Sequence, residues 1–291
     1  MENKYAYSKI IAGTMGWGSW GKGFSQAGMA SLINECTELG ITTFDHADIY
    51  GNYTNEAEFG KAFQESGVDR EKIQLITKCG IQKVAEGRGN GIKHYNYSED
   101  YILWSAEQSL KHLQTEYLDL LLLHRPSPLM HPEPIAKAIT KLKNQGKIKS
   151  FGVSNFMPSQ IAMIESAITV SANQVEFSLT SSEAMYNGIF DDCITHGRMA
   201  MAWSPLGSFF KEKTSRTERI SEVIDAFSKK YSCTADQLLL AWILRHPAKV
   251  FPVVGTASGH SLKDAMAATK LQLELEDWFV LLQVSQGHEV P

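Results

Sequence analysis

Residues 98–124 read SEDYILWSAEQSLKHLQTEYLDLLLLH, and this stretch contains both kinds of element from which the rest of the chain is built. Its first part repeats apolar residues at helical spacing behind Ser98, a residue type that caps helices well. Its last part, 118–124, is a short run that is apolar on both faces, as expected for a strand covered by helices. We therefore predict a helix over 98–113 followed by a buried strand.

The same alternation of a short apolar run and a longer amphipathic segment continues along the whole chain. It predicts eight strands, at 10–13, 42–45, 73–79, 118–124, 150–154, 172–176, 199–203 and 250–254. Strands that alternate with helices form a parallel sheet. Eight such repeats without a long linker favour a closed (β/α)₈ TIM barrel, which typically needs about 250 residues. We expect one barrel domain over residues 1–291.

An open, doubly wound sheet is the alternative, and it would place a GxGxxG turn directly after the first strand. Residues 16–21, GWGSWG, have that spacing, but their Trp residues and the polar, Gly-rich stretch that follows do not open a helix. Two long segments, 82–97 and 208–219, follow the third and seventh predicted strands. In a barrel such loops lie on the C-terminal face, where the chemistry takes place, so we expect both to border the functional site.

The composition is that of an ordinary globular enzyme: 43% of residues are hydrophobic and 21% are charged, which argues against disorder. Lys and Arg number 28 against 32 Asp and Glu, without a basic stripe, so we expect no nucleic-acid partner. No apolar run approaches the roughly 20 residues that a membrane span needs. Residues 1–5 lack the apolar stretch of a secretory signal, and the four cysteines are scattered, so we expect a cytoplasmic, reduced protein.

Four ionisable side chains stand at or just beyond the ends of predicted strands: Asp45, Tyr50, Lys78 and His124. A carbonyl that accepts hydride needs a proton donor at its oxygen, and a phenol with a pKa of about 10 is too weak an acid without a neighbouring cation. Lys78 is suited to supply that charge, Asp45 to keep it protonated, and His124 to orient the carbonyl oxygen. Taken singly, each has a structural alternative, and Lys78 alone also fits the Schiff-base lysine of an aldolase barrel.

The chain resembles the aldo-keto reductase superfamily over nearly its whole length, and residues 275–279 and 287–291 resemble a bacterial oxidoreductase branch of it. The resemblance rests on seven motifs in the family's order, together with Asn55-Glu56 and Gly60 after the second. The motifs are GTM (13–15), FDHADIYG (44–51), ITK (76–78), LLLH (121–124), GVSNF (152–156), NQVE (173–176) and WSPLG (203–207).

The resemblance implies a catalytic tetrad of Asp45, Tyr50, Lys78 and His124, with Tyr50 as the general acid of carbonyl reduction. It implies that Ser154, Asn155 and Gln174 bind the nicotinamide carboxamide, and that Trp203 stacks on the ring in place of the family's usual Tyr. The other cofactor-binding residues that it implies are Thr14, Met15, Asp45, Ser204, Pro205, Leu206, Gly207, Ser208, Gly255, Thr256, Ser258 and Lys263.

The implied cofactor is NADP(H), but residues 255–263 offer only Lys263, or a protonated His260, as a cation for the 2′-phosphate, so NAD(H) stays open. We expect no metal, because the histidines do not pair at ligand spacing. Four residues are expected to line the mouth of the substrate pocket, with ordinary packing at the barrel rim as the alternative reading. They are Trp17, Trp20, Ile49 and Tyr97.

The function that these observations favour is NADP(H)-dependent reduction of small aldehydes or ketones by a monomer or weak homo-oligomer. A cofactor-sensing barrel with little turnover is the second hypothesis, because an intact tetrad does not exclude a regulatory role. An aldolase that uses Lys78 is the third, and it would leave Tyr50 and Gln174 without roles. The sequence does not identify the substrate.

Overall fold

Eight parallel strands close into a barrel in the computed structural model, which describes residues 7–290. Around the barrel the strands follow the order β1, β10, β9, β8, β7, β6, β3 and β2, so the first and last strands in the sequence pair. The predicted (β/α)₈ barrel is therefore confirmed. The strands are β1 (Ile11–Gly13), β2 (Thr43–Asp45), β3 (Gln74–Cys79), β6 (Leu118–Leu123), β7 (Ile148–Ser154), β8 (Ala172–Glu176), β9 (Met199–Trp203) and β10 (Phe251–Val254).

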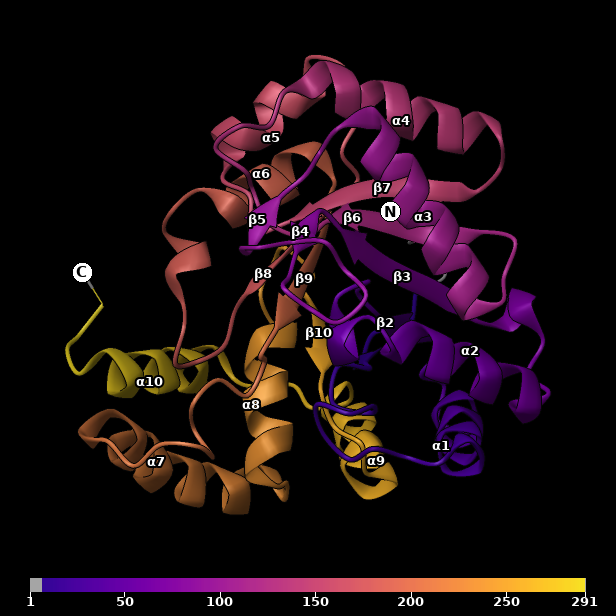
Figure 1. The fold of residues 1–291 in the computed structure, drawn as a ribbon. Helices are drawn as coiled ribbons and strands as arrows, with labels where there is room; N and C mark the ends of the chain where they lie inside the picture. The colour runs from indigo at the N-terminus through magenta and orange to yellow at the C-terminus, as the bar shows by residue number, and fades with distance from the viewer. Residues whose placement is uncertain (1–6, 291) are drawn as a thin grey trace.

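Helices surround the barrel as an outer ring (Figure 1). They are α1 (Gln26–Glu38), α2 (Asn55–Ser66), α3 (Glu99–Leu113), α4 (Pro132–Asn144), α5 (Pro158–Glu165), α6 (Ile189–His196), α7 (Ser215–Tyr231), α8 (Ala235–Leu244), α9 (Gly259–Ala268) and α10 (Leu275–Gln286). Each predicted strand coincides with an observed one to within two residues at either end. The Ser98 side chain caps α3 as predicted, because its Oγ accepts a hydrogen bond from the Tyr101 N–H at 3.3 Å.

The two long segments differ from the plain loops that the sequence predicts. Residues 81–82 (β4, Ile81–Gln82) pair antiparallel with residues 94–95 (β5, His94–Tyr95), so the segment after β3 is a hairpin, which we call the β4–β5 hairpin. It is drawn in front of the barrel strands in Figure 1. The segment after β9 is shorter than predicted, because α7 already begins at Ser215 behind its cap, Thr214.

Apolar side chains fill both the barrel interior and the layer between strands and helices. Inside the barrel, buried side chains from several strands pack together: Ile11, Ile76, Leu120, Leu122, Ala172, Met201 and Val253. Strands of a barrel ringed by helices are buried on both faces, which explains the uninterrupted apolar runs in the sequence. Each strand can therefore place polar residues at its ends without disturbing this core.

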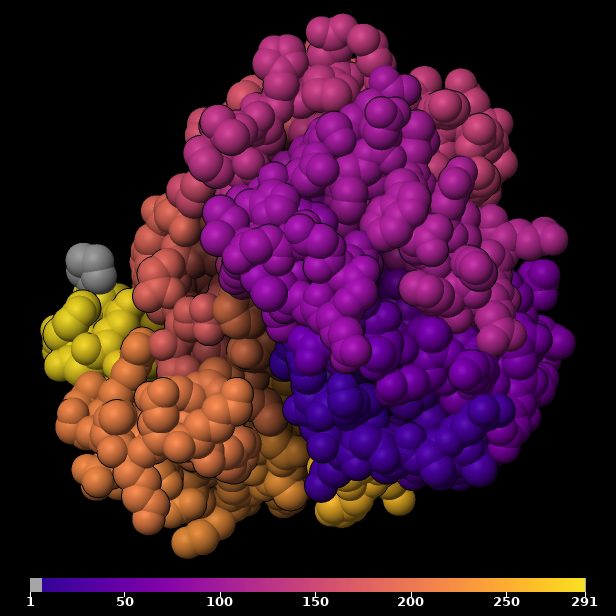
Figure 2. All heavy atoms as spheres, in the orientation of Figure 1, coloured from indigo at the N-terminus to yellow at the C-terminus, as the bar shows by residue number. Residues whose placement is uncertain are grey.

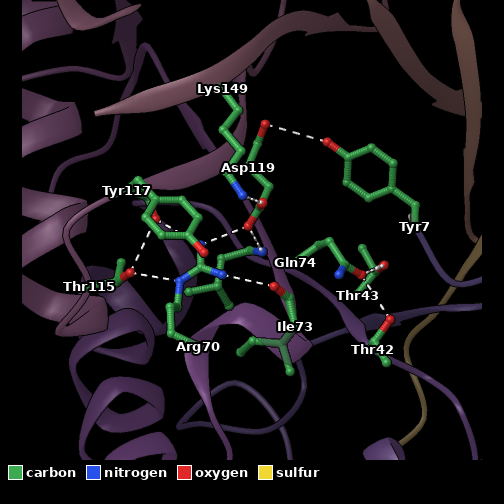
Figure 3. Close-up of polar contacts among 11 residues, drawn as sticks. Tyr7, Thr42, Thr43, Arg70, Ile73, Gln74, Thr115, Tyr117, Asp119 and Lys149 are labelled. Carbon is green, nitrogen blue, oxygen red and sulfur yellow. Dashed lines mark hydrogen bonds and ion pairs between the residues drawn. The ribbon is translucent and has the colours of Figure 1, made fainter. Parts of the chain in front are cut away.

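One polar cluster stabilises the opposite end of the barrel from the strand ends considered below (Figure 3). Arg70 donates to the Asp119 carboxylate at 2.7 Å and to the carbonyls of Ile73 and Tyr117 at 2.8 Å each. Lys149 adds a second cation to Asp119 at 2.9 Å. Buried charges are tolerated when they are paired and hydrogen-bonded, so we assign this cluster a structural role.

No helix within residues 7–290 is long and apolar enough to cross a bilayer. All four cysteines lie in the described part of the chain and are unpaired; Cys36, Cys79 and Cys193 are buried.

Candidate active site

The four predicted tetrad residues lie together at the C-terminal ends of neighbouring strands. Asp45 ends β2, Lys78 is the penultimate residue of β3, and His124 directly follows β6. Tyr50 begins a 3-10 turn shortly after β2. Because β2, β3 and β6 are adjacent and parallel in the barrel, residues far apart in sequence meet at one end.

Lys78 is the centre of this group. Its buried ammonium donates to the Asp45 Oδ2 at 2.6 Å, to the His46 carbonyl at 2.8 Å and to the Tyr50 hydroxyl at 3.4 Å. Burial lowers the pKa of Lys78, but the charge of Asp45 and the contacts with Asp45 and Tyr50 outweigh it, so the pKa lies above its ordinary value. The amine is therefore a cation at neutral pH, held against the phenol.

The expected acidification of Tyr50 is only partly present. Burial raises the pKa of the phenol, and the positive charges of Lys78 and Arg125 lower it without cancelling the effect of burial. The pKa of Tyr50 therefore lies above its usual value of 10, not below it. The charge of Lys78 thus reduces the rise in the Tyr50 pKa that burial causes. The phenol stays protonated at neutral pH.

His124 packs edge-on against Tyr50, with 6.1 Å between the ring centroids. Burial, followed by the charges of Lys78, Arg125 and Lys93, holds the pKa of the imidazole well below its usual range, so the ring is neutral. Its Nδ1 is buried and has no hydrogen-bond partner within residues 7–290. A buried polar atom without a partner is costly, and at the end of a barrel strand it indicates a place for a ligand.

A chain of hydrogen bonds leads from the tetrad to the residues expected around the nicotinamide. The side-chain Nε2 of Gln174 donates to the Asp45 Oδ1 at 2.9 Å. The Ser154 Oγ donates to the backbone carbonyl of Gln174 at 2.9 Å. Asn155 Nδ2 donates to Ser154 Oγ at 2.8 Å and its Oδ1 accepts from Trp203 Nε1 at 2.9 Å. The ends of β7, β8 and β9 thus form one polar surface beside the tetrad.

Because β9 and β10 pair in parallel, the loops that follow them leave the same end of the barrel, and both have features suited to a phosphate-bearing ligand. Ser204 and Gly207 have positive φ angles of 50° and 55°. A Cβ at Gly207 would lie 2.0 Å from Thr180 Oγ1, so only glycine fits this turn. Pro205, Leu206 and Ser208 belong to the same turn, and the Ser208 N–H already donates to Thr180 Oγ1 at 3.0 Å.

After β10, space at Gly255 is open, since no heavy atom comes within 4 Å of where its Cβ would lie. Helix α9 starts at Gly259, and its N-cap, Ser258, makes no capping hydrogen bond with its side chain, which leaves the helix N-terminus available to an anion. Thr256 Oγ1 accepts from the Ser258 N–H at 3.2 Å. Lys263 is exposed on the same helix.

The two expected cofactor residues after β1 differ in their surroundings. Thr14 is fully buried; its hydroxyl donates to the Asp45 carbonyl at 3.0 Å and lies 2.8 Å from His46 Nδ1. This hydroxyl is therefore committed within the protein, whereas the side chain of Met15 is 50% exposed.

Of the four residues expected at the mouth, only Trp20 is exposed, with its ring 6.1 Å from that of Tyr50. Trp17 is fully buried: it packs edge-on against Phe44 and its Nε1 donates to the Thr256 carbonyl at 3.1 Å. For Trp17 the alternative reading, ordinary packing, describes the structure, because a fully buried ring has no surface for a ligand. Ile49 is buried in a small apolar cluster with Ala47 and Ile81, and Tyr50 packs against this cluster.

Tyr97 is also buried, and its hydroxyl donates to the Arg125 carbonyl at 2.5 Å. Arg125 itself is a residue that the sequence analysis missed. It directly follows His124, and its guanidinium Cζ lies 5.4 Å from the centroid of the Trp203 ring. The sequence His124-Arg125-Pro126 contained the signal that could have identified it. A charged residue directly after a strand-end histidine lies at the same end of the barrel as that histidine.

Two buried carboxyls behind the tetrad were also missed. Asp48 Oδ2 accepts from Ser105 Oγ at 3.0 Å, and Glu56 accepts from Thr77 Oγ1 at 2.6 Å. Burial and the charge of Glu56 raise the pKa of Asp48 to about 8, and burial raises that of Glu56 to about 7. Within residues 7–290, no three His, Cys, Asp or Glu side chains are grouped so as to hold a metal ion.

The family model for the aldo/keto reductase family matches residues 9–284, and the chain belongs to this family of oxidoreductases. The chain is 40% identical to the oxidoreductase YcsN of Bacillus subtilis (strain 168), over 98% of this chain and 96% of that one. It is 36% identical to a 6-dehydroglucose reductase of Agrobacterium fabrum, over 100% and 98% of the two chains.

Among solved structures, an aldo/keto reductase from Klebsiella pneumoniae in complex with NADP and acetate superposes with a TM-score of 0.79 at 25% identity. The superposition covers 98% of this chain and 93% of that one. The sequence resemblance to the aldo-keto reductases, and to bacterial oxidoreductases among them, is thus confirmed.

Proposed function

We propose that this chain is an NADP(H)-dependent reductase that converts small aldehydes or ketones to alcohols, with Tyr50 as the general acid. The observation that carries the proposal is the geometry at Lys78, whose Nζ is 2.6 Å from Asp45 Oδ2 and 3.4 Å from the Tyr50 hydroxyl. This arrangement places an ammonium that is charged at neutral pH beside the phenol that packs against His124. Such a cation stabilises the phenolate that is left when Tyr50 gives up its proton.

The cofactor is inferred from the fit of the site and from the NADP bound to the Klebsiella pneumoniae relative. When bound, NADPH supplies the hydride that the carbonyl carbon accepts. Ser154, Asn155 and Gln174 would hold the nicotinamide carboxamide, and Trp203 would lie against the ring. The turn at 204–208, the residues at 255–258 and Lys263 would bind the phosphates, with Thr14 and Met15 beside them.

Each tetrad residue then has a role that its surroundings support. Neutral His124 orients the carbonyl oxygen through a ring nitrogen, which fits the low pKa of its imidazole. Tyr50 donates its proton to that oxygen as negative charge develops there. Asp45 keeps Lys78 charged and, through Gln174, connects it to the nicotinamide site. Trp20 and Ile49 remain the residues that we propose at the substrate mouth, with Trp20 offering the exposed surface.

The alternative of a Schiff-base aldolase has less support. A Schiff-base lysine attacks as a neutral amine, which requires a lowered pKa. Lys78 instead has a raised pKa and donates three hydrogen bonds. On composition we further expect a single-domain, cytoplasmic monomer or weak homo-oligomer without nucleic-acid partners.

The test follows NADPH absorbance with a panel of aldehydes, ketones and quinones, using wild type, Tyr50→Phe and Tyr186→Phe. Tyr186 is an exposed tyrosine whose hydroxyl contacts only Gln286 among the described residues, so it controls for loss of a phenol as such. We expect Tyr50→Phe to lower reduction at least about a hundredfold while NADPH still binds, measured by fluorescence quenching. Near-normal turnover by Tyr50→Phe would refute the assignment. NADPH binding without oxidation by any carbonyl would favour the cofactor sensor.

A further inference from the structure

Arg125 is an unpaired cation beside the proposed reaction centre. It follows His124 directly, and its guanidinium lies over the Trp203 ring with 5.4 Å between Cζ and the ring centroid. It is partly buried, yet no carboxylate within residues 7–290 forms an ion pair with it. A partly buried arginine without an anionic partner is unusual, because desolvating a charge is costly unless an opposite charge compensates for it.

The backbone of Arg125 is held in place by Tyr97. The Tyr97 hydroxyl donates to the Arg125 carbonyl at 2.5 Å and accepts from the Arg125 N–H at 3.2 Å. The Tyr97 ring in turn packs on Gly80, where a Cβ would lie 1.9 Å from Tyr97 Cε1. The backbone of Arg125 is therefore fixed by Tyr97, and its guanidinium rests against the Trp203 ring. A cation with fewer conformations to lose binds an anion with less loss of entropy.

Further cations lie on the β4–β5 hairpin, and none of them forms an ion pair within the described part of the chain. Lys83 Nζ lies 4.0 Å from the centroid of the Trp20 ring and 3.3 Å from Asn52 Oδ1. Lys93 is exposed and close enough to His124 for its charge to lower the pKa of that imidazole. Figure 2 shows the violet atoms near residue 90 across the middle of this face, with a furrow between them and the orange C-terminal third.

The carboxyls nearby, including the exposed Glu86 of the hairpin, form no ion pair with these cations within residues 7–290. Asp45 is paired with Lys78, and the buried Asp48 is protonated at neutral pH because its pKa is about 8. Burial raises the pKa of Glu176, at the end of β8, and the charge of Arg125 opposes this rise, but the two side chains do not form an ion pair. The chain has a formal charge of −4, so this concentration of positive charge is a local property of the site and not of the whole surface.

We infer that the carbonyl substrate carries an acid group, a carboxylate or a phosphate, and that Arg125 binds this group while Lys83 and Lys93 attract it. The inference rests on the proposed carbonyl reduction and names its substrate class. A guanidinium offers two parallel N–H donors that match a carboxylate or phosphate, so Arg125 would orient the substrate as well as bind it. The Trp20 ring, next to Lys83, would contact the apolar part of the same molecule.

The first experiment compares pairs of aldehydes that differ in whether they carry an acid group. 4-Carboxybenzaldehyde and its methyl ester test the carboxylate, and glyceraldehyde 3-phosphate and glyceraldehyde test the phosphate. We expect kcat/KM to favour an acid over its neutral partner by at least about tenfold, the loss expected for one charge-assisted hydrogen bond. The KM of the acid should rise with added salt, whereas that of the ester should not.

The second experiment measures the same ratios in Arg125→Gln, Arg125→Lys and a control, Arg245→Gln. Arg245 is exposed after α8 and makes no ion pair within residues 7–290, so its loss changes the net charge equally. The acid-to-neutral ratio should fall at least about tenfold in Arg125→Gln, recover in part in Arg125→Lys, and stay at the wild-type value in Arg245→Gln.

The outcomes separate this inference from the proposed function. Reduction of neutral aldehydes with equal or better kcat/KM than the acids, unchanged by Arg125→Gln, would overturn the acid-group inference and leave the reductase intact. No reduction of any carbonyl would overturn the proposed function. If Arg125→Gln instead weakens NADPH binding and leaves the ratio unchanged, Arg125 serves the cofactor and the inference is wrong.

Discussion

The buried carboxyls Glu56 and Asp48 make the stability of this protein depend on pH in a predictable direction. Glu56 is buried and accepts hydrogen bonds from Thr77 Oγ1 at 2.6 Å and Ser109 Oγ at 3.0 Å. Burial raises its pKa from 4.5 to about 7, and burial with the charge of Glu56 raises that of Asp48 from 3.8 to about 8. Both groups therefore keep a proton in the folded protein at pH values where the unfolded chain has released it.

The folded state then binds more protons than the unfolded state, so these groups make the free energy of unfolding fall as pH rises. The fall begins near the unfolded pKa of about 4 and is complete above the folded pKa. For Glu56, a rise of the pKa from 4.5 to about 7 corresponds to about 3 kcal/mol. The buried His46, whose pKa is lowered to about 3 mainly by burial, acts in the opposite direction below pH 6.5.

The assay is urea unfolding of wild type, Glu56→Gln and Glu116→Gln at pH 5 and pH 8. Glutamine is uncharged at both pH values, so the variant should exceed wild type by only about 1 kcal/mol at pH 5, where the fall has just begun, and by about 3 kcal/mol at pH 8. The comparison at equal pH cancels the contribution of His46. Glu116 is exposed and should have no such effect. If Glu56→Gln loses as much stability as wild type between pH 5 and 8, Glu56 is not held protonated and the reasoning is wrong.

Three further predictions follow from the site and the core. Lys78→Met should raise the apparent pKa of the acid in the pH profile of reduction, and an unchanged profile would exclude coupling of Lys78 to Tyr50. The same variant should lower the free energy of unfolding by about 3–5 kcal/mol, because Asp45 loses its cation. Gly207→Ala should cost about 1–3 kcal/mol and weaken NADPH binding, measured by thermal shift with and without NADPH, since φ is 55° and a Cβ would collide with the hydroxyl of Thr180. Trp17→Ala should lower the free energy of unfolding by about 3–5 kcal/mol, and a loss below 1 kcal/mol would contradict a core position.

The elements that the sequence predicted well have local signals. An apolar run followed by a polar residue defines a strand and its C-terminal end, and parallel strands bring such ends together whatever the packing details. That is why Asp45, Lys78 and His124, which are widely separated in the chain, were predicted at one site. The α3 boundary also has a local cause, because Ser98 bonds to a backbone N–H only three residues away.

The sequence says least about residues whose surroundings depend on distant parts of the chain. Trp17 and Tyr97 are aromatic residues near the barrel rim, and composition does not tell whether such a ring faces a ligand or the core. Trp17 is enclosed because Phe44 and Phe59 pack on it, and Tyr97 because its hydroxyl binds the backbone of Arg125. The net effect on the Tyr50 pKa likewise depends on burial, which is a property of the whole fold.

The sequence by itself thus determined the barrel and the chemical types that meet at its C-terminal end, since both follow from periodicity and from the parallel arrangement of strands. Only the tertiary structure decided which side chains remain accessible there. It brought the cations of the β4–β5 hairpin to the same face as Arg125 and left Arg125 without a carboxylate among the described residues. Charge compensation between distant segments has no signature in local sequence, because it depends on distances that only the folded chain defines.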